Sequence, residues 1–413
     1  MDGREQRGLA IAALCRLNHQ EFGWLVPSQS RTDTQYLVDP ERGTCTCPDH
    51  KEHGHVCKHV HAVRFTLKRE MNKDGTITES KTLTFTEEKT YTQNWPVYDR
   101  AQMVEKHRFL ELLHNLCKGI PDYPQPKTGR RHAPFCDMIF AAVYKVYSAV
   151  SSRRFACDLK DAHEKGYISH LMHSVQTCEF LESPMLTDAL QKLIEQSSLP
   201  LRAIETVFAP DSTGFSTSRF VRWFDEKYGI TRSGRDWVKL HAIVGTKTNV
   251  ITAVEIHDQD AADSPQFKPL VEKTAKNFTV KEVPADKAYL SHENLELVAS
   301  LGGTAYIPFK SNSSLGEAGT VWEKMYLFYE FKREEFAKHY HQRSNAESAF
   351  SALKAKFGDS VRSKTSIAMK NEVLAKVLCH NVCVLIQSQL ELGIELVFWK
   401  NEPATERTIL PMA

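Results

Sequence analysis

The sequence lacks a long apolar run and lacks an excess of charge of either sign. No stretch of about 18 apolar residues occurs, so no membrane span is expected. Lys and Arg number 53 against 51 Asp and Glu, which excludes a strong overall attraction to acidic partners. Any binding to nucleic acid must therefore come from local basic patches. The first residues show no recognisable cleavage site and are expected to form an ordinary helix.

The ten cysteines show no pattern of a disulfide framework. Cys379 and Cys383 stand singly in a helical pattern, whereas three others are clustered near the N-terminus. This usage predicts a reducing compartment, expected to be the cytoplasm. Internal repeats and low-complexity blocks are also absent, and 413 residues allow two or three domains.

The cysteine cluster lies in a first module, residues 1–73. Cys45-x-Cys47 is followed, after nine residues, by Cys57-x-His59. Zinc prefers four thiolate or imidazole ligands in a tetrahedron, so these two pairs predict one structural zinc ion. Further histidines at positions 50, 53, 55 and 61 leave the choice of imidazole open, and the order of the thiolates favours His59.

This spacing resembles a SWIM-type zinc finger. A module of this size can hardly bury enough core unaided, so zinc that only stabilises a small fold is one interpretation. Contact with DNA and contact with protein are the alternatives that remain open.

The rest of the chain divides by its hydrophobic pattern. Residues 74–95 are polar and predict a linker or a loose hairpin. Residues 96–204 are helical, with a basic, proline-containing interruption at 124–134. From residue 205 to 395 the order is strand, hairpin, helix, strand, helix, strand, helix, which predicts an α/β domain with a mixed sheet. A C-terminal tail covers residues 396–413.

Three acidic residues are placed where such a sheet gathers functional groups. Asp211 is expected at the end of the first strand and Asp286 at the end of a later one, and strand ends of this kind lie near each other. Glu347 is expected in a long helix over 333–357, on the face that also presents Tyr340, Arg343 and Lys354. Three carboxylates from separate elements can hold two Mg²⁺ ions, which suits phosphodiester cleavage.

Each acidic residue also has an ordinary interpretation. A lone Asp after a strand is usually a turn or cap residue, and a Glu four residues after an Arg is usually a surface ion pair. The order of elements and the full spacing together favour the catalytic interpretation.

The motifs Asp211-Ser-Thr, Asp286-Lys-Ala-Tyr and Tyr340-x2-Arg343-x3-Glu347-x6-Lys354 resemble those of the IS4-type DDE transposases. The resemblance covers about residues 130–395 and implies an RNase H-like fold. It implies that Asp211, Asp286 and Glu347 bind two Mg²⁺ or Mn²⁺ ions. It further implies that Tyr340, Arg343 and Lys354 contact DNA, with Lys287 also in reach, and that residues 96–204 recognise the ends of the element.

The segment near 309–332 is expected to be a short insertion. Trp322 within it could stack on a flipped base, as in relatives with such a Trp, or simply pack in the core. Other basic or aromatic residues are candidates for DNA contact or for plain solvated surface: Lys127, Arg130, Arg131, Arg153, Arg154, Arg219, Arg222 and Trp223.

The expected function is cut-and-paste transposition at terminal inverted repeats. The expected partners are transposon and target DNA and further copies of the chain, in a homodimer or larger assembly, at the nucleoid of a bacterial host. The alternatives are a catalytically silent, domesticated DNA-binding protein, a SWIM-type protein adaptor, and an RNase H-like nuclease of repair.

Overall fold

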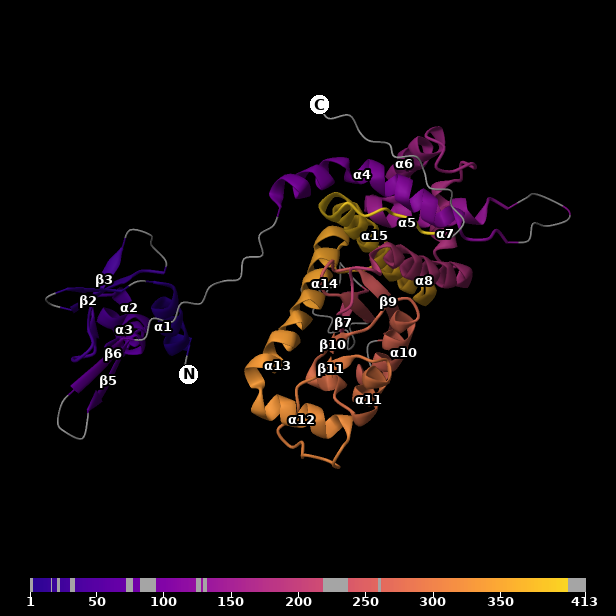
Figure 1. The fold of residues 1–413 in the computed structure, drawn as a ribbon. Helices are drawn as coiled ribbons and strands as arrows, with labels where there is room; N and C mark the ends of the chain where they lie inside the picture. Colours follow the sequence, from indigo (N-terminus) through magenta and orange to yellow (C-terminus); the bar gives the residue numbers. More distant parts are fainter. Residues whose placement is uncertain are drawn as a thin grey trace, which may run out of the picture. The chain divides into compact units, whose positions relative to one another are not determined.

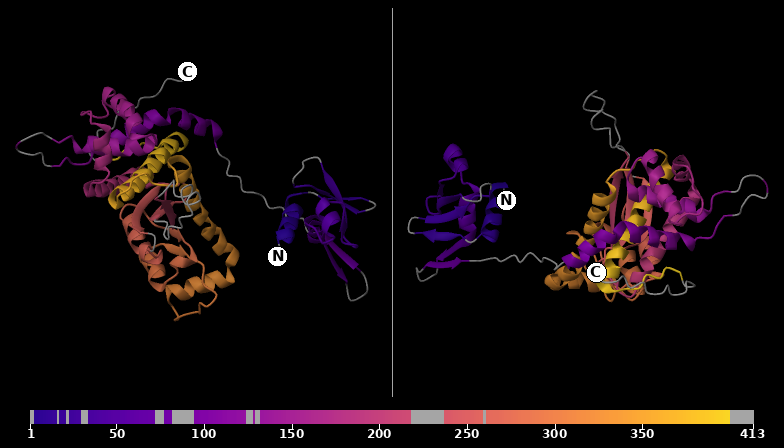
Figure 2. Two further views of the ribbon diagram at one scale, coloured as in Figure 1. Left: turned by 180° about the vertical axis from the view of Figure 1, so that it is seen from behind. Right: turned by 90° about the horizontal axis from the view of Figure 1, so that it is seen from above.

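A computed structural model describes residues 3–15, 17–20, 23–29, 34–71, 77–81, 94–123, 128, 132–217, 237–258 and 261–399. Several predicted DNA contacts lie outside the described residues, namely Lys127, Arg130, Arg131, Arg219, Arg222 and Trp223. The tail predicted for 396–413 is described only as far as residue 399. The chain forms two compact units, Met1–Thr92 and Gln93–Ala413 (Figures 1 and 2).

The first unit is a small antiparallel meander packed against helices. Buried Val26 and Val38 of the sheet meet Val60 and Val63 of a helix in one core. This core is small, which agrees with the expectation that the module needs further stabilisation. Its elements are α1 (Gly3–Leu14), β1 (Asn18–Gln20), β2 (Gly23–Pro27), β3 (Gln35–Asp39), β4 (Thr44–Cys45), α2 (Pro48–His53) and α3 (Lys58–Thr66).

A two-stranded arm follows the meander. β5 (Leu67–Met71) and β6 (Ile77–Lys81) pair antiparallel, from Leu67 opposite Lys81 to Met71 opposite Ile77. The polar segment predicted for 74–95 therefore begins as one strand of a hairpin, and it is not a linker over its whole length.

The second unit begins with a layer of helices, as the hydrophobic period between 96 and 204 indicates (Figure 1). Phe109, Leu113, Ile139 and Leu190 are among the side chains that close its core. The helices are α4 (Trp95–Lys118), α5 (Phe135–Ser148), α6 (Ser152–Glu164), α7 (Ser174–Phe180), α8 (Pro184–Ser198) and the short 3-10 turn η1 (Leu199–Leu201).

A mixed sheet follows. β7 (Phe208–Ser216), β8 (Trp237–Gly245) and β9 (Ile251–Asp258) form an antiparallel meander. β10 (Glu282–Pro284) and β11 (Thr304–Tyr306) run parallel to each other. A parallel bridge from Val207 to Glu282 joins the two groups, so the strand order is β9-β8-β7-β10-β11.

Two strand predictions need correction. β7 continues to Ser216 because residues 212–216 pair with residues 237–241 of β8, so Asp211 lies inside the strand and not at its end. The later strand, which was expected to end at Asp286, is limited to Glu282–Pro284 and ends two residues earlier. Proline has no backbone N–H for a further ladder bond, which suits the end of a strand.

Helices cover both faces of the sheet (Figures 1 and 2). Side chains alternate between faces along a strand. Phe208 and Ile243 accordingly share one cluster with Phe267 of α10 (Ser264–Ala275), whereas Ala209 and Leu240 share another with the helices of the opposite face. The remaining elements are η2 (Lys287–Tyr289), α11 (His292–Ser300), α14 (Ser344–Phe357) and α15 (Ser366–Leu392).

α15 is the central helix of this unit. It is long and apolar enough to cross a membrane, but 72% of its most apolar window is buried inside the domain. Asn381 of α15 accepts from the Ile251 N–H at 2.9 Å and donates to the Ile251 carbonyl at 2.7 Å. His380 Nε2 lies 2.9 Å from the Asn249 carbonyl. Both residues are buried and bond to backbone groups around the start of β9, so α15 is a core helix.

The long helix predicted for 333–357 is divided. α13 (Arg333–Tyr340) is followed by the 3-10 turn η3 (His341–Arg343) before α14 begins. A 3-10 turn has three residues per turn and shifts the helical phase, so the predicted single stripe from Tyr340 to Lys354 is wrong in detail. The insertion near 309–332 is mainly a helix, α12 (Val321–Phe331).

Candidate active site and metal centre

The three predicted carboxylates come from three separate elements beside the middle of the sheet. Asp211 extends from β7, and Asp286 follows β10, the parallel neighbour of β7, at the N-cap of η2. Glu347 lies in the first turn of α14, which packs on β7 and β8. Asp211 shares its face of the sheet with Ala209, the face on which α14 lies.

Arg343 joins two of these residues. Its Nη2 donates to Glu347 Oε1 at 2.6 Å, and its Nη1 lies 3.7 Å from Asp211 Oδ2. Burial alone would lower the pKa of Arg343, but Tyr340, Glu347, Asp211 and Asp286 raise it above its ordinary value. One guanidinium therefore lies within the field of all three carboxylates.

The charges of the other two acids act on the pKa of Asp211. Burial raises its pKa above the ordinary value, and the charges of Glu347 and Asp286 raise it further. The Ser212 N–H and Arg343 act in the opposite direction. Carboxylates of like charge repel one another, and such groupings are typical of functional sites. A bound divalent cation would remove this repulsion.

The donor set fits Mg²⁺ or Mn²⁺, which take carboxylate oxygens and keep several waters. Among the described residues, only the cysteine cluster brings all its ligand atoms within 4.8 Å of one another. The oxygens of the three carboxylates are not all within that distance. The Arg343 guanidinium lies where a cation between Asp211 and Glu347 would lie, so bound metal would have to compete with it.

The predicted DNA contacts surround this centre unevenly. Lys287 is exposed directly after Asp286, and Tyr340 closes α13 one residue before η3. Lys354, two turns along α14 from Glu347, holds its Nζ 5.5 Å from the centre of the Phe215 ring. Burial lowers the pKa of Lys354.

Trp322 lies in an aromatic cluster with His292 and Phe309, within the second unit. Its ring stacks on His292 at 4.0 Å and meets the edge of Phe309 at 4.9 Å. Its Nε1 donates to the Ser314 carbonyl at 2.9 Å. These contacts agree with the interpretation that Trp322 packs within its domain. Stacking on a flipped base stays a prediction.

A polar cluster on the opposite face of the sheet was not predicted. Asp263 lies 2.8 Å from Lys239 Nζ and 3.4 Å from His241 Nδ1. The buried hydroxyl of Tyr289 makes no hydrogen bond to any described residue, and burial together with the charges of Asp263, Asp211 and Asp286 raises its pKa. The signal was available in the alternate polar positions of the 237–258 hairpin, where Lys239 and His241 face the same way.

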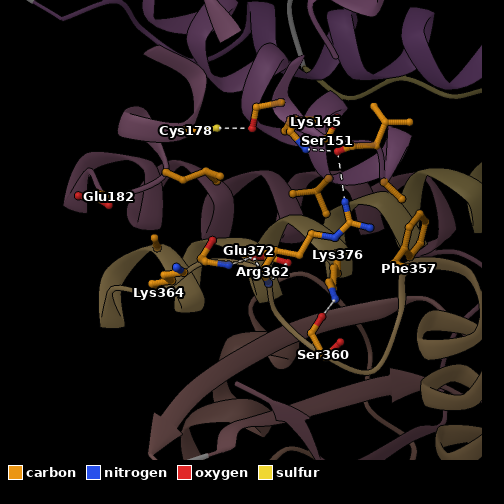
Figure 3. Close-up of a pocket in the computed structure, with 17 residues that line it drawn as sticks. Lys145, Ser151, Cys178, Glu182, Phe357, Ser360, Arg362, Lys364, Glu372 and Lys376 are labelled. Atoms are coloured by element: carbon orange, nitrogen blue, oxygen red, sulfur yellow. Dashed lines mark hydrogen bonds between the residues drawn. The ribbon is translucent and has the colours of Figure 1, made fainter. Parts of the chain in front are cut away.

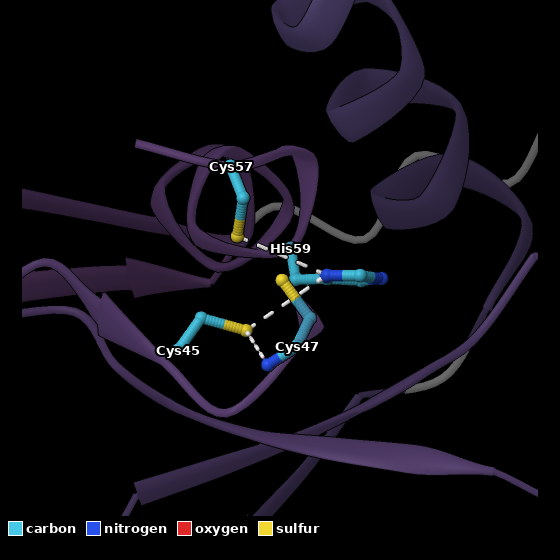
Figure 4. Close-up of side chains that lie close together, drawn as sticks. All are labelled: Cys45, Cys47, Cys57 and His59. Carbon is cyan, nitrogen blue, oxygen red and sulfur yellow. Dashed lines mark hydrogen bonds between the residues drawn. The ribbon is translucent and has the colours of Figure 1, made fainter. Parts of the chain in front are cut away.

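In the first unit, Cys45, Cys47, Cys57 and His59 bring their ligand atoms within 4.8 Å of one another, and all four are buried (Figure 4). His59 Nδ1 lies 3.8 Å from the sulfur atoms of both Cys45 and Cys57. A hydrogen bond from Cys45 lowers the pKa of the Cys57 thiol. The cluster can hold a metal ion.

The local fold explains why these four residues meet. Cys45 ends the meander in β4, and Cys47 is the N-cap of α2. Gly54 ends α2 with φ 67, a left-handed conformation that favours glycine, and so returns the chain to Cys57 and the start of α3.

The other histidines lie outside the cluster. His50 Nδ1 lies 2.7 Å from the His55 carbonyl, and His55 lies beside Asp49. Among the described residues, His59 is therefore the imidazole of the group, which resolves the alternative left open by the sequence.

Comparison with protein families gives one match within the second unit. Residues 202–382 match the model of a family described as the transposase DDE domain. The matched segment begins just before β7, includes Asp211, Asp286 and Glu347, and ends within α15. Over residues 202–382 this chain is therefore similar to the transposase DDE domains.

Proposed function

We propose that the chain is an IS4-type transposase that moves DNA by a cut-and-paste reaction at terminal inverted repeats. The observation that supports this most is the shared field of the three acids. Asp211 responds to Asp286 and Glu347, although 75 and 136 positions separate them in the sequence. An ordinary turn residue or surface ion pair would not join two acids so far apart in the sequence through one guanidinium, as Arg343 joins Asp211 and Glu347.

Asp211, Asp286 and Glu347 would hold two Mg²⁺ or Mn²⁺ ions. Such ions, when bound, activate the attacking oxygen and stabilise the leaving oxygen of an in-line displacement. The protein's own groups position the DNA: Arg343, Tyr340, Lys354 and Lys287 would contact phosphates or bases near the cut, and Trp322 would contact DNA only if it left His292. These side chains come from four elements, α13, η3, α14 and η2.

The reaction has two displacements. Water attacks the phosphodiester at the end of the element, a new P–O bond forms, and the 3′ oxygen leaves as a hydroxyl. That hydroxyl then attacks a phosphodiester of the target, whose own 3′ oxygen leaves. Both displacements use one site because nucleophile and leaving group are oxygens of the same kind.

The Cys45–Cys47–Cys57–His59 cluster would hold one structural Zn²⁺ in a SWIM-type finger. Three sulfurs and one imidazole nitrogen are a common tetrahedral set for structural zinc. We expect the enzyme to act as a homodimer or larger assembly that pairs two DNA ends, in the cytoplasm at the nucleoid of a bacterial host.

The test is metal-dependent cleavage of a labelled duplex taken from the DNA that flanks the gene. The wild-type protein should nick it with Mg²⁺, and Asp286→Asn should lower the rate more than about 100-fold, since losing a ligand costs at least as much as losing its support. Glu296→Gln, an exposed acid on α11, is the matched control and should cut normally.

Other outcomes identify the alternatives. DNA binding without any cleavage by the wild type would support a silent, domesticated protein. Equal cutting of duplexes with and without the inverted repeat would support a repair nuclease. Equal cleavage by wild type and Asp286→Asn would refute the proposed site.

A further inference from the structure

A pocket of about 540 Å³ lies away from the three carboxylates, between the helical layer and the segment that joins α14 to α15 (Figure 3). We call it the Lys145–Arg362 pocket. Four cations line it, Lys145, Arg362, Lys364 and Lys376, against two carboxylates, Glu182 and Glu372. Its net charge is positive in a chain whose overall charge is nearly balanced.

The cations at this pocket are short of anionic partners. Lys145 Nζ and Arg362 Nη1 both donate to one carbonyl oxygen, that of Val150, at 2.5 and 3.2 Å. Lys376 donates to the carbonyls of Gly358 and Ser360. Neutral carbonyls thus accept the hydrogen bonds of three cations. Burial lowers the pKa of Lys145, and the nearby charge of Arg362 lowers it further, so an anion in the pocket would be stabilising.

The one buried carboxylate of the pocket, Glu372, offsets part of this positive charge, because its charge acts on Lys145 and Lys376. Glu372 accepts the backbone N–H groups of Arg362 and Ser363 with both oxygens, at 2.8 to 3.0 Å. It is therefore occupied in holding the backbone of the loop. Ser151 and Ser152, at the N-terminus of α6, complete the rim, and Ser151 makes no side-chain cap to that helix. Free helix N–H groups are further donors for an anion.

Two structural paths connect the pocket to the carboxylates. Phe357 of the pocket lies about ten residues along α14 from Glu347, which is about 15 Å at 1.5 Å per residue. Ser360 of the pocket pairs with Ser216, five residues along β7 from Asp211, a span of about 16 Å. Lys354 and Lys376 lie on the Phe215 ring between the two places, at 5.5 and 5.3 Å.

We propose that the Lys145–Arg362 pocket binds a backbone phosphate of the DNA strand whose scissile phosphate lies at the three carboxylates. This inference rests on the proposed function and adds a second, non-catalytic contact to it. Phosphates of one strand wind around the axis, so their separation through space exceeds the axial rise of about 3.4 Å, and a span of about 15 Å places the contact two to three nucleotides from the cut. Arg362 and Lys364, both exposed at the mouth, make the first contact.

The first test uses an ordinary duplex, because phosphates are the same in every sequence. Arg362→Gln/Lys364→Gln is compared with Lys268→Gln/Lys281→Gln, which removes two exposed charges on α10 and before β10. Both carry Asp286→Asn so that the DNA stays intact. The slope of log affinity against log salt should become shallower by about 1 to 2 in the first pair only, since each lost phosphate contact contributes about 0.9.

Equal slopes in the two variants would overturn the inference and would leave the pocket to another kind of ligand, such as an acidic peptide. Equal thermal unfolding of all proteins checks that the fold is retained. If the slopes differ but the wild type never cuts DNA with Mg²⁺, the proposed function fails and the phosphate site stands. If the wild type cuts DNA and the slopes are equal, only the phosphate site fails.

The second test locates the contact. A duplex ending at the cut, with one neutral methylphosphonate at each position in turn, should bind the wild type about tenfold more weakly when the substitution is two to three nucleotides from the end. The Arg362→Gln/Lys364→Gln variant should lose this dependence. Interference at the same positions in both proteins would place the phosphate elsewhere and refute the assignment.

Discussion

Arg343 donates to Glu347 across 2.6 Å, and the same guanidinium lies 3.7 Å from Asp211. A side chain expected to bind DNA is thus engaged with two of the acids expected to bind metal. Cation and metal compete for the same oxygens, and the arrival of DNA phosphate would draw Arg343 away from them. Metal binding and DNA binding are therefore expected to support each other.

Replacing Arg343 by Gln should separate these effects. We expect the affinity for Mn²⁺ without DNA, measured by electron paramagnetic resonance, to rise about tenfold because a competing cation is gone. DNA cleavage should fall at the same time. Arg333→Gln, which loses an ion pair with Glu330 and a contact with the Tyr329 ring, is the control and should change neither. Weaker Mn²⁺ binding by Arg343→Gln would contradict the competition.

Replacing Asp211 and replacing Asp263 by the neutral Asn should have opposite effects on the stability of the fold. Burial raises the pKa of Asp211, so its ionised form costs stability as pH rises above the ordinary value of 3.8. Burial also opposes ionisation of Asp263, but Lys239 and Ser212 lower its pKa, so its charge stabilises the fold above that pH.

Without added metal at pH 7, Asp211→Asn should therefore raise the melting temperature by a few degrees and Asp263→Asn should lower it. Mg²⁺ should raise the melting temperature of the wild type and not that of Asp211→Asn. Differential scanning calorimetry measures both. A lower melting temperature for Asp211→Asn would mean that this carboxylate serves the fold.

His241 should make the second unit sensitive to mild acid. Burial lowers its pKa from 6.5 to about 4, assisted by Lys239 and His257 and opposed by Asp263 and Glu255. The unfolded chain takes up the proton first, so stability is present at neutral pH and is lost as pH falls from about 6.5 towards 4. A shift of this size corresponds to about 3 kcal/mol.

Urea unfolding at several pH values between 7.5 and 4.5 measures this loss. His241→Gln should flatten the dependence, even if the variant is less stable throughout. His163→Gln, exposed on α6, should keep the wild-type slope. An unchanged slope in His241→Gln would assign the acid sensitivity to other groups.

Removing zinc should unfold the first unit and spare the second. Structural zinc contributes about 10–16 kcal/mol in small fingers, far more than the small core around Val38 can supply. Cys45→Ser should lose one zinc per chain by elemental analysis, and proteolysis should then digest residues 1–92 only. Cys157→Ser, an exposed thiol, should keep its zinc. A fully folded first unit in metal-free Cys45→Ser would contradict a structural role.

Helices and strands could be predicted from the sequence where the periodicity of their own residues is sufficient to identify them. The 237–258 hairpin follows from its alternation and the turn at Gly245, and α15 follows from its apolar period. The Cys-x-Cys and Cys-x-His pairs follow from the chemistry of zinc ligands. The three acids are predicted from spacing and resemblance together, because no single one differs locally from an ordinary turn or surface residue.

What escaped prediction depends on contacts between distant residues. The extent of β7 beyond Asp211 is decided by pairing with residues 237–241, across a gap of more than 20 positions. The Asp263–His241 contact joins a helix start to a strand, and the pocket cations come from α5, the 358–365 loop and α15. Periodicity describes one element at a time and therefore gives no account of such groupings.

The tighter turn at His341–Arg343 interrupts an otherwise continuous helical path from α13 to α14. Hydrogen-bond geometry is poorer in a 3-10 turn, so the rod bends there at the lowest cost. The far end of α14 is anchored, because Lys376 holds the carbonyls of Gly358 and Ser360. The near end is held as well, because Ala346 and Ala349 are buried in the core and Asn345 donates to the Thr246 carbonyl at 2.9 Å. The change of phase at the 3-10 turn therefore sets the direction in which Glu347 leaves the helix, and a continuous helix through residues 341–343 would turn the third acid away from its two partners.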